Sequence, residues 1–236
     1  MCGRFTLTTT DNLLQEIGDA DLVVEETPFL PGMEPQFNIA PTQSVAVLSF
    51  DKIETSRLSQ MRWGLIQHWA SDDYLQKPLF NARSETIREK PSFRESFRQR
   101  RCLIFADGYY EWKVEGKDRQ PYFFHLPDRR LFAFAGLWDQ WRSPTDETIQ
   151  SCTIVTTSAS ARFEIIHPRQ PVILPPEEWK TWINPEFDDL KVLDSMMSHN
   201  AAEKLEHYAV SSYVNKTAHD DERCLEPASI QGSLFD

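Results

Sequence analysis

The chain has 236 residues, enough for one well-filled core or at most two small domains. Hydrophobic residues make up 40% of it, but no apolar run reaches the roughly 18 residues that a membrane span needs, so a packed soluble protein is expected. The formal net charge of −11, taken alone, argues against a nucleic-acid-binding surface. The N-terminus lacks the apolar run of a signal peptide, which predicts a cytoplasmic protein.

The first part of the chain predicts a short helix, a hairpin and a broken helical segment. Residues 11–18 favour a helix, and residues 19–44 are proline-rich and irregular. Residues 45–50 and 58–65 predict two strands joined by a polar turn. Residues 84–100 favour one or two helices, interrupted at the proline within them.

The second part predicts mainly strands. The strand-like segments are apolar runs between turn residues: RCLIFAD (101–107), YYEWK (109–113), PYFFHL (121–126), LFAFAGLW (131–138), CTIVTT (152–157) and EHYAVSS (206–212). PPEEWKTWI (175–183) and residues 187–197 predict helices, and the polar segment from 216 is expected to be loose. Because strands predominate and the helices do not alternate with them, we predict an α+β fold with a mostly antiparallel, barrel-like core and peripheral helices.

The cysteines and the charge distribution narrow the chemistry. The four cysteines are far apart and form no C-x-x-C pair, which predicts neither a metal site nor a disulfide framework. Cys102 and Cys152 lie in strand-like runs and are expected in the core. Residues 81–101 hold seven basic and three acidic residues, a net charge of +4. This stretch favours either a DNA-binding face or a solvated helix face with Glu–Arg pairs.

Cys2 is informative because of its position. Removal of Met1, which is general before a small second residue, would leave an α-amine beside a thiol. An α-amine is partly neutral at pH 7 and can attack an aldehyde, after which the adjacent thiol can close a thiazolidine ring. A chance Met-Cys start without function is the alternative.

Three further segments carry candidate acids, bases and amides. FNARSET places Asn81, Arg83 and Glu85 on alternating positions, which share one face if the segment is extended. ADGYYEWK places Glu111 among aromatic residues, where a raised pKa would suit proton transfer. IHPRQPVIL places His167 at the end of an apolar run, with Arg169 nearby. A turn cap, a structural ion pair and a core histidine are the alternatives.

Two segments offer possible nucleic-acid contacts. FNIAPTQ joins Asn38 to Pro41 in an expected loop, which suits either DNA contact or a turn. MRWGLIQHWA carries Trp63 and Trp69. An exposed Trp can stack on a base, whereas core packing is the expected fate of Trp63.

Taken together, these segments resemble the SRAP (SOS-response-associated peptidase) family. The matching blocks occur in order along nearly the whole chain: MCGRF, FNIAP, RWGL, FNARSET, FADGYYEWK, IHPRQPVIL and AVSSYVN. The resemblance implies one compact α+β domain over residues 2–227, with a barrel-like core and a positively charged cleft, followed by a tail over 228–236.

The resemblance also implies an activity and its residues. Family members capture the aldehyde of an abasic site in single-stranded DNA as a thiazolidine crosslink on the N-terminal cysteine, here Cys2. Asn81 would orient the cysteine, Glu111 would transfer protons, and His167 would promote sugar ring opening. The residues implied to bind DNA are Arg4, Asn38, Pro41, Trp69, Arg83, Trp112 and Arg169. The same catalytic set would support a secondary, self-processing peptidase activity.

The expected protein works without a cofactor and as a monomer, and it is nucleoid-associated when bound to DNA. Two positions depart from the family pattern: Gln67 replaces a proline and Gln170 replaces a methionine. Both are expected on DNA-facing loops, which puts the details of DNA preference in doubt.

The tail contains a second motif. Gln231, Leu234 and Phe235 form a Q-x-x-L-F pattern that resembles the peptide by which bacterial replication and repair proteins dock on the sliding clamp. A chance sequence whose Leu-Phe packs back on the domain is the alternative.

Two other functions fit parts of the sequence. Class II glutamine amidotransferases, which are N-terminal-nucleophile amidohydrolases, also mature to an N-terminal Cys-Gly, as here before Arg4. A noncatalytic DNA-binding module would use the basic stretch without needing Cys2.

Overall fold

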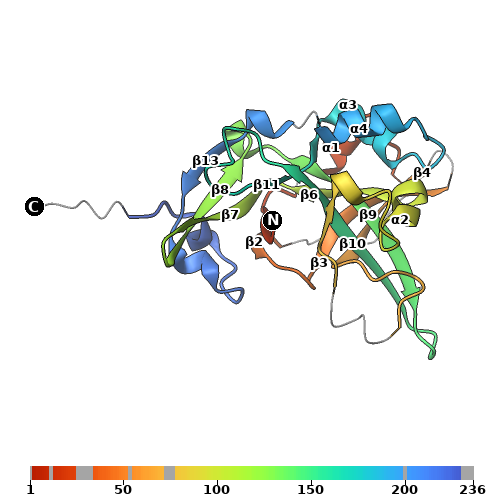
Figure 1. The fold of residues 1–236 in the computed structure, drawn as a ribbon, viewed down its shortest axis with the longest axis horizontal. Coiled ribbons are helices and arrows are strands. Elements are labelled where there is room, and N and C mark those ends of the chain that lie inside the picture. Colours follow the sequence, from red (N-terminus) through yellow and green to blue (C-terminus); the bar gives the residue numbers. More distant parts are fainter. Residues whose placement is uncertain are drawn as a thin grey trace, which may run out of the picture.

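Two β-sheets form the core of this computed structural model, which describes residues 2–10, 13–24, 34–52, 55–71, 78–198 and 201–229 (Figure 1). The first sheet has five strands in the order β13-β8-β7-β1-β2. Its strands are β1 (Arg4–Leu7), β2 (Gln36–Ile39), β7 (Gly108–Glu115), β8 (Asp118–His125) and β13 (Glu206–Ala209). All of its pairings are antiparallel.

The second sheet closes on itself. Its eight strands are β3 (Ser44–Lys52), β4 (Thr55–Trp63), β5 (Asn81–Arg83), β6 (Arg101–Ala106), β9 (Phe132–Arg142), β10 (Thr148–Ser158), β11 (Arg169–Pro171) and β12 (Ile173–Leu174). The order β10-β4-β3-β6-β9 returns to β10, because β10 pairs with both β4 and β9. This closure makes the sheet a barrel, as predicted. Strand β10 pairs in parallel with β4 and β5, and its pairing with β9 is antiparallel.

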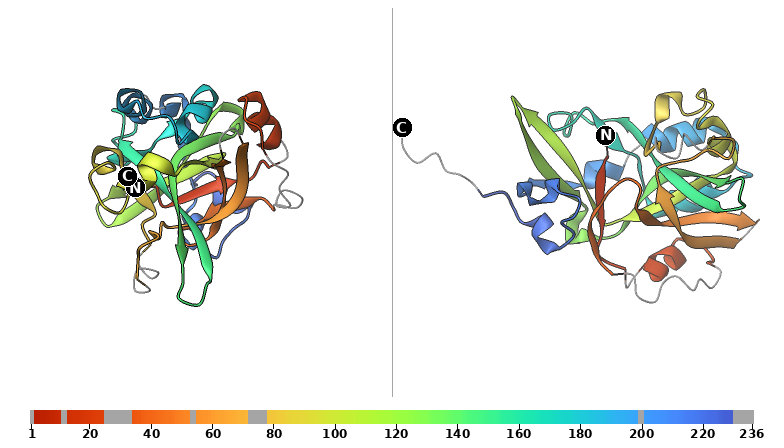
Figure 2. Two further views of the ribbon diagram at one scale, coloured as in Figure 1. Left: turned by 90° about the vertical axis from the view of Figure 1, so that its right-hand side faces the viewer. Right: turned by 90° about the horizontal axis from the view of Figure 1, so that it is seen from below.

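Short helices lie around the sheets, as the sequence predicted. They are α1 (Leu13–Asp19), α2 (Arg94–Gln99), α3 (Pro176–Ile183) and α4 (Leu190–Ser198), with 3₁₀ turns at Ser84–Thr86, Pro127–Arg129, Ala201–Lys204, Ser212–Asn215 (η5) and Glu222–Leu225 (η6). Figure 2 shows α3 and α4 together on one side of the barrel, and the β9–β10 hairpin extending from it. No helix among the described residues is long and apolar enough to cross a membrane.

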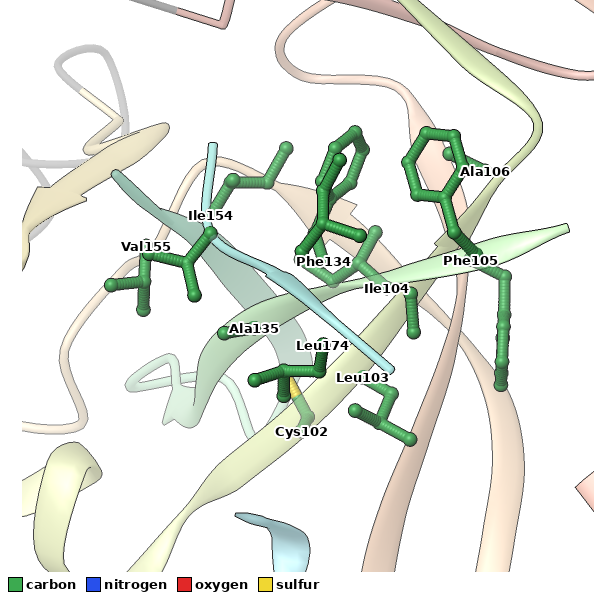
Figure 3. Packing of buried hydrophobic residues seen from close by; sticks show 14 of the residues in the cluster. Cys102, Leu103, Ile104, Phe105, Ala106, Phe134, Ala135, Ile154, Val155 and Leu174 are labelled. Atoms are coloured by element: carbon green, nitrogen blue, oxygen red, sulfur yellow. The ribbon is translucent and has the colours of Figure 1, made fainter. Parts of the chain in front are cut away.

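Strand β6 explains how the barrel is filled. All six of its residues are buried, because one face looks into the barrel and α3 covers the other. Figure 3 shows its side chains packed with those of β9 and β10. Trp179 of α3 meets Phe105 edge-on, with ring centroids 5.5 Å apart. Cys102 and Cys152 are both fully buried, as predicted for core residues.

The segment after residue 216 differs from its prediction. It was expected to be loose, but residues 216–229 fold back on β2 and β13. Asp220 accepts hydrogen bonds from the backbone N–H groups of Phe37 and Asn38, and Ala228 N–H donates to the carbonyl of Ala209 at 2.9 Å. Polar side chains and short 3₁₀ turns hold this segment in place, and neither gives the hydrophobic periodicity from which order can be predicted.

Arg101 joins two helices to the barrel, and among the described residues it has no carboxylate partner. It is 3% exposed, and burial lowers its pKa to about 10, so it stays charged at neutral pH. Its guanidinium donates to four carbonyls at the C-terminal ends of α2 and α3, those of Phe97, Arg98, Trp182 and Asn184, and to the carbonyl of Phe187 in the segment after α3. Carbonyls at a helix C-terminus have no partners within the helix and carry the negative end of its dipole.

Replacing Arg101 should therefore destabilise the fold strongly. We expect Arg101→Met to lower the free energy of unfolding by about 3 kcal/mol or more, because several buried carbonyls lose a charged donor. Urea unfolding followed by circular dichroism measures the change. Arg98→Met, an exposed position on α2, is the control and should change stability by about 0.5 kcal/mol at most. A similar small effect for Arg101→Met would contradict the assignment.

Candidate functional site

Strand β1 holds the segment that begins at Cys2 inside the structure. This strand pairs with β2 on one edge and with β7 on the other, with Arg4 opposite Tyr110 and Phe5 opposite Tyr109. Extending this register by one pair places Gly3 opposite Glu111. Cys2 is fully buried at the start of this strand, so β1 delivers it to the interior beside Glu111.

Asp107 fastens the other end of β1. Its buried carboxylate accepts hydrogen bonds from the hydroxyls of Thr6 and Thr8, from Thr8 N–H at 2.7 Å and from Thr9 N–H at 3.0 Å. Its own N–H donates to the carbonyl of Thr6 at 3.0 Å. The next residue, Gly108, allows β7 to approach β8 closely, because a Cβ there would lie 2.2 Å from the ring of Phe123. Asp107 and Gly108, which lead into β7, therefore set the register of β1 against β7.

Asn81 reaches Cys2 from the second sheet. Strand β5 pairs in parallel with β10, where Asn81 lies opposite Ile154. The Asn81 Nδ2 donates a 2.8 Å hydrogen bond to the carbonyl of Cys2. Its Oδ1 is buried and has no hydrogen-bond partner among the described residues. A buried acceptor without a donor is unfavourable, so it is suited to a donor brought by a ligand or by a free α-amine.

Glu111 and His167 form the titratable part of the site. Glu111 is 4% exposed, and burial raises the pKa of its carboxyl. His167 Nδ1 lies 3.8 Å from Glu111 Oε1. The same Nδ1 lies 2.9 Å from the carbonyl of Arg169 and 3.1 Å from its N–H. The backbone of Arg169 thus offers an acceptor to a protonated Nδ1 and a donor to an unprotonated one, so the ring can change protonation state without moving.

Burial also sets the state of the thiol. Burial of the Cys2 thiol and the negative charge of the nearby Glu111 carboxylate both raise the pKa of the thiol. The thiol is therefore protonated at neutral pH, and a nucleophilic attack would have to begin elsewhere or be assisted by a base.

Glu111 and His167 border a cleft of about 590 Å³, and Gly3 and Phe80, the neighbours of Cys2 and Asn81 in the chain, also line it. Its lining residues are Gly3, Arg4, Phe80, Glu111, Trp112, Val114, Arg119, His167 and Asn215. The sequence did not single out Phe80, Val114, Arg119 or Asn215. Phe80 and Asn215 lie inside the FNARSET and AVSSYVN blocks, so their position in those blocks was the available signal. In the described part of the chain, no three His, Cys, Asp or Glu side chains group as a metal site would require.

Asn38 has a different role from the one expected. It was assigned to direct DNA contact in a loop, but it lies in β2 and is 1% exposed. Its Nδ2 donates to the carbonyls of Val214, Lys216 and His219, and its Oδ1 accepts from Arg4 Nη1 at 2.8 Å. Its polar atoms are therefore committed to the protein, and it positions Arg4 instead.

Arg4 and Trp112 lie together at the cleft. Arg4 also donates to the carbonyl of Val214 at 3.0 Å, and its guanidinium carbon lies 5.9 Å from the ring centroid of Trp112. Trp112 Nε1 donates to Asn215 Oδ1 at 2.7 Å. The 3₁₀ turn η5 thus fixes both side chains.

The other expected DNA contacts lie on separate elements, and none of them lines the cleft among the described residues. Arg83 follows Asn81 on β5 and is exposed. Trp69 is 50% exposed, whereas Trp63 is buried in the core as predicted. Pro41, just after β2, is partly buried. Arg169 is engaged by Glu85 through two hydrogen bonds, of 2.5 Å and 3.1 Å.

Three of the seven basic residues between 81 and 101 are engaged within the protein. Arg101 is buried, Arg88 pairs with Asp194 at 3.0 Å, and Arg100 pairs with Glu95 at 2.9 Å and with Asp139. The other four are exposed: Arg83, Lys90, Arg94 and Arg98.

The two departures from the family pattern are not at the surface. Gln67 is 3% exposed and Gln170 is 4% exposed, whereas both were expected on DNA-facing loops. Gln170 Oε1 accepts from Ser160 N–H at 3.1 Å, so it stabilises the turn before His167. The tail residues Gln231, Leu234 and Phe235 lie outside the described residues.

The buried carboxyl of Glu111 should reduce stability at neutral pH. Its pKa is raised in the folded state, so as the pH rises the unfolded chain loses this proton first and folding becomes less favourable. We expect Glu111→Gln to be more stable than the wild type at pH 7, by about 1 kcal/mol or about 2–4 °C in Tm. The difference should shrink below about pH 4.3, where the unfolded carboxyl is also protonated.

Thermal unfolding at several pH values measures this difference. Glu164→Gln, at an exposed position, is the matched control and should show no such pH-dependent gain. A Glu111→Gln variant that is less stable than the wild type at pH 7 would show that the carboxylate stabilises the fold.

Comparison with known proteins agrees with this geometry. A family model described as SOS response associated peptidase (SRAP) matches residues 1–217. Abasic site processing protein YoqW of Bacillus subtilis (strain 168) is 39% identical over 232 residues, covering 96% of this chain and 99% of that protein. Abasic site processing protein HMCES of Gallus gallus is 31% identical over 227 residues, covering 83% of this chain and 67% of that protein.

A solved structure shares the fold. The crystal structure of a protein from Bacteroides thetaiotaomicron superposes with a TM-score of 0.82 at 24% identity, covering 96% of this chain and all of that one. The family model spans β1, Asn81, Glu111 and His167, the elements that converge on the cleft. This chain belongs to the SRAP family.

Proposed function

We propose that this protein captures abasic sites in single-stranded DNA as a covalent thiazolidine on Cys2, after removal of Met1. One observation supports this most strongly. Groups from two sheets meet at the N-terminus, where Asn81 holds the Cys2 carbonyl and Glu111 lies 3.8 Å from His167. The names of the relatives, which describe abasic site processing, point in the same direction.

The α-amine would act first. Burial keeps the Cys2 thiol protonated, whereas an α-amine of ordinary pKa is neutral in roughly 10–20% of molecules at pH 7. The neutral amine adds to the ring-opened sugar aldehyde and forms a carbinolamine. Loss of water then gives an imine, and the thiol S–H adds across the C=N bond. Sulfur bonds to the former aldehyde carbon, and the thiol proton ends on nitrogen.

Glu111 and His167 would move the protons. Because burial raises its pKa, Glu111 is suited to protonate the leaving hydroxyl of the carbinolamine. His167, with a partner for Nδ1 in either protonation state, would assist opening of the sugar ring and the reverse reaction. The unpartnered Asn81 Oδ1 would accept a hydrogen bond from the α-amine and orient it. Self-processing after Met1 would use the same groups.

The DNA strand would follow the cleft and the arginines beside it. Arg4, Arg83 and Arg169 would hold phosphates, because a guanidinium binds phosphate through two parallel hydrogen bonds. Trp112, Trp69 and Pro41 would contact sugars or bases next to the lesion. With a net charge of −11, the protein is expected to bind undamaged DNA only modestly and with strong salt dependence.

A crosslinking assay tests the central claim. Wild-type protein is incubated with single-stranded DNA carrying one abasic site and analysed on a denaturing gel, with intact mass confirming that Met1 is absent. We expect a covalent product that forms without a reducing agent, because a thiazolidine is stable where an imine is not.

Two variants separate the amine from the thiol. Cys2→Ser and Cys2→Ala keep an α-amine but cannot form the sulfur ring, so their products should need borohydride to survive the gel. Wild-type protein that lacks Met1 and yields no covalent product would overturn the proposal, and glutamine hydrolysis and reversible DNA binding would then be assayed.

We also propose that the tail docks on the replication sliding clamp. Its Q-x-x-L-F pattern offers one amide and two apolar anchors, Gln231, Leu234 and Phe235, as peptide-in-groove binding requires. Docking would bring the protein to forks, where single-stranded abasic DNA arises.

Binding of an immobilised peptide spanning 228–236 to purified clamp tests the tail. We expect micromolar binding that is lost when Leu234 and Phe235 are both replaced by Ala. No binding of the native peptide at high micromolar clamp would remove this proposal and leave the crosslinking proposal untouched.

A further inference from the structure

The structure contains a carboxylate where a DNA phosphate would be expected to bind. Arg169 follows His167 by two residues, at the entrance to β11, and its side chain is 15% exposed. Its two Nη groups donate to the two oxygens of Glu85, at 2.5 Å and 3.1 Å. This two-pronged geometry is the one that a guanidinium also forms with phosphate.

The rest of the arginine is anchored independently of Glu85. Its Nη2 donates to the carbonyl of Thr156 at 2.7 Å and to the Thr156 hydroxyl at 3.2 Å. Arg169 also pairs with Ser158 in the β10–β11 ladder. The guanidinium would therefore keep its place without the carboxylate, so Glu85 is not needed to position it.

The Glu85 side chain, in contrast, can move away from Arg169. It is 46% exposed and lies in a 3₁₀ turn. Besides those from Arg169, it accepts hydrogen bonds from the Ser158 hydroxyl at 3.4 Å and from the N–H of its own residue. The hydrogen bonds from Arg169 lower its pKa, so it stays ionised at neutral pH. Rotation of this carboxylate into solvent would expose the guanidinium beside the catalytic histidine.

We propose that Glu85 is a latch that competes with DNA phosphate for Arg169. The inference rests on the proposed function and adds a determinant of selectivity to it. In the free protein the carboxylate neutralises Arg169, and a strand must displace it to bind. Undamaged DNA would gain little from this exchange and would dissociate, whereas an abasic strand is retained by the covalent step. The latch would thus keep the site unoccupied when undamaged DNA is in large excess over abasic sites.

Removing the charge of Glu85 should strengthen reversible DNA binding. The probe is an undamaged single-stranded oligonucleotide of about 15 nucleotides, which spans the site but has no aldehyde. For Glu85→Gln and Glu85→Ala we expect affinity to rise about twofold to fivefold, as for release of a partly exposed ion pair. The slope of log K against log salt should become more negative by about 0.7, because one more phosphate is neutralised.

Two controls separate the latch from a general charge effect. Glu89→Gln makes the same charge change at an exposed position four residues away. In an Arg169→Gln background, Glu85→Gln should have no effect, because the latch has lost its partner. An equal gain in Glu89→Gln, or a gain that persists without Arg169, would overturn the latch.

The sign of the change tests the main alternative. If Glu85 instead positioned Arg169 for DNA, Glu85→Gln would weaken binding and make the salt slope shallower. Weaker or unchanged binding in a folded Glu85→Gln or Glu85→Ala variant, as judged by thermal unfolding, would therefore reject the latch.

Competition extends the test to selectivity. Undamaged competitor DNA should inhibit crosslinking of abasic DNA more strongly in Glu85→Gln than in the wild type. Failure of the latch proposal gives a different result from failure of the proposed function. Wild-type protein that crosslinks abasic DNA while Glu85→Gln shows no tighter binding rejects the latch alone. Wild-type protein lacking Met1 that never crosslinks rejects the proposed function.

Discussion

Strand β1 is hydrogen-bonded along both edges, between β2 and β7, and the candidate site depends on that pairing. A terminal segment is ordinarily among the least ordered parts of a domain. Here the carboxylate of Asp107 binds Thr6, Thr8 and Thr9, so the first strand cannot slide or fray. Because the strand is fixed, Cys2 is held at one position relative to Glu111, and proximity can contribute to the chemistry.

The second constraint is the meeting of two sheets. The closed barrel supplies Asn81 through β5, and the turn before β11 supplies His167, while the other sheet supplies Cys2 and Glu111. The site retains unfavourable features, including a buried carboxyl of raised pKa and an amide oxygen that has no hydrogen-bond partner in the part of the chain that the structure describes. Such features are expected where function takes precedence over stability. Close packing in the neighbouring barrel stabilises the fold enough to offset the cost of these buried polar groups.

Charge is organised locally in this acidic protein. Arg101 is satisfied by carbonyls, Arg4 by Asn38 and the carbonyls of η5, and Arg169 by Glu85. The first two contacts fix a guanidinium within the fold, and neither uses a carboxylate. Only Arg169 has its charge neutralised by an exposed acid next to the candidate site, which makes that pair adjustable by a ligand. The net charge of −11 therefore says less about DNA binding than these pairings do.

The sequence by itself determined the strand-rich α+β class, the burial of apolar runs such as RCLIFAD, and the candidates Cys2, Asn81, Glu111 and His167, because alternation and ordered motif blocks are local properties. Only the tertiary structure decided that Asn38 holds Arg4, that Gln67 and Gln170 are buried, and that residues 216–229 are ordered. The Asn38–Arg4 contact and the order of residues 216–229 depend on hydrogen bonds between segments far apart in the chain. The partner of a polar side chain is chosen by the fold, and no periodicity in the sequence records that choice.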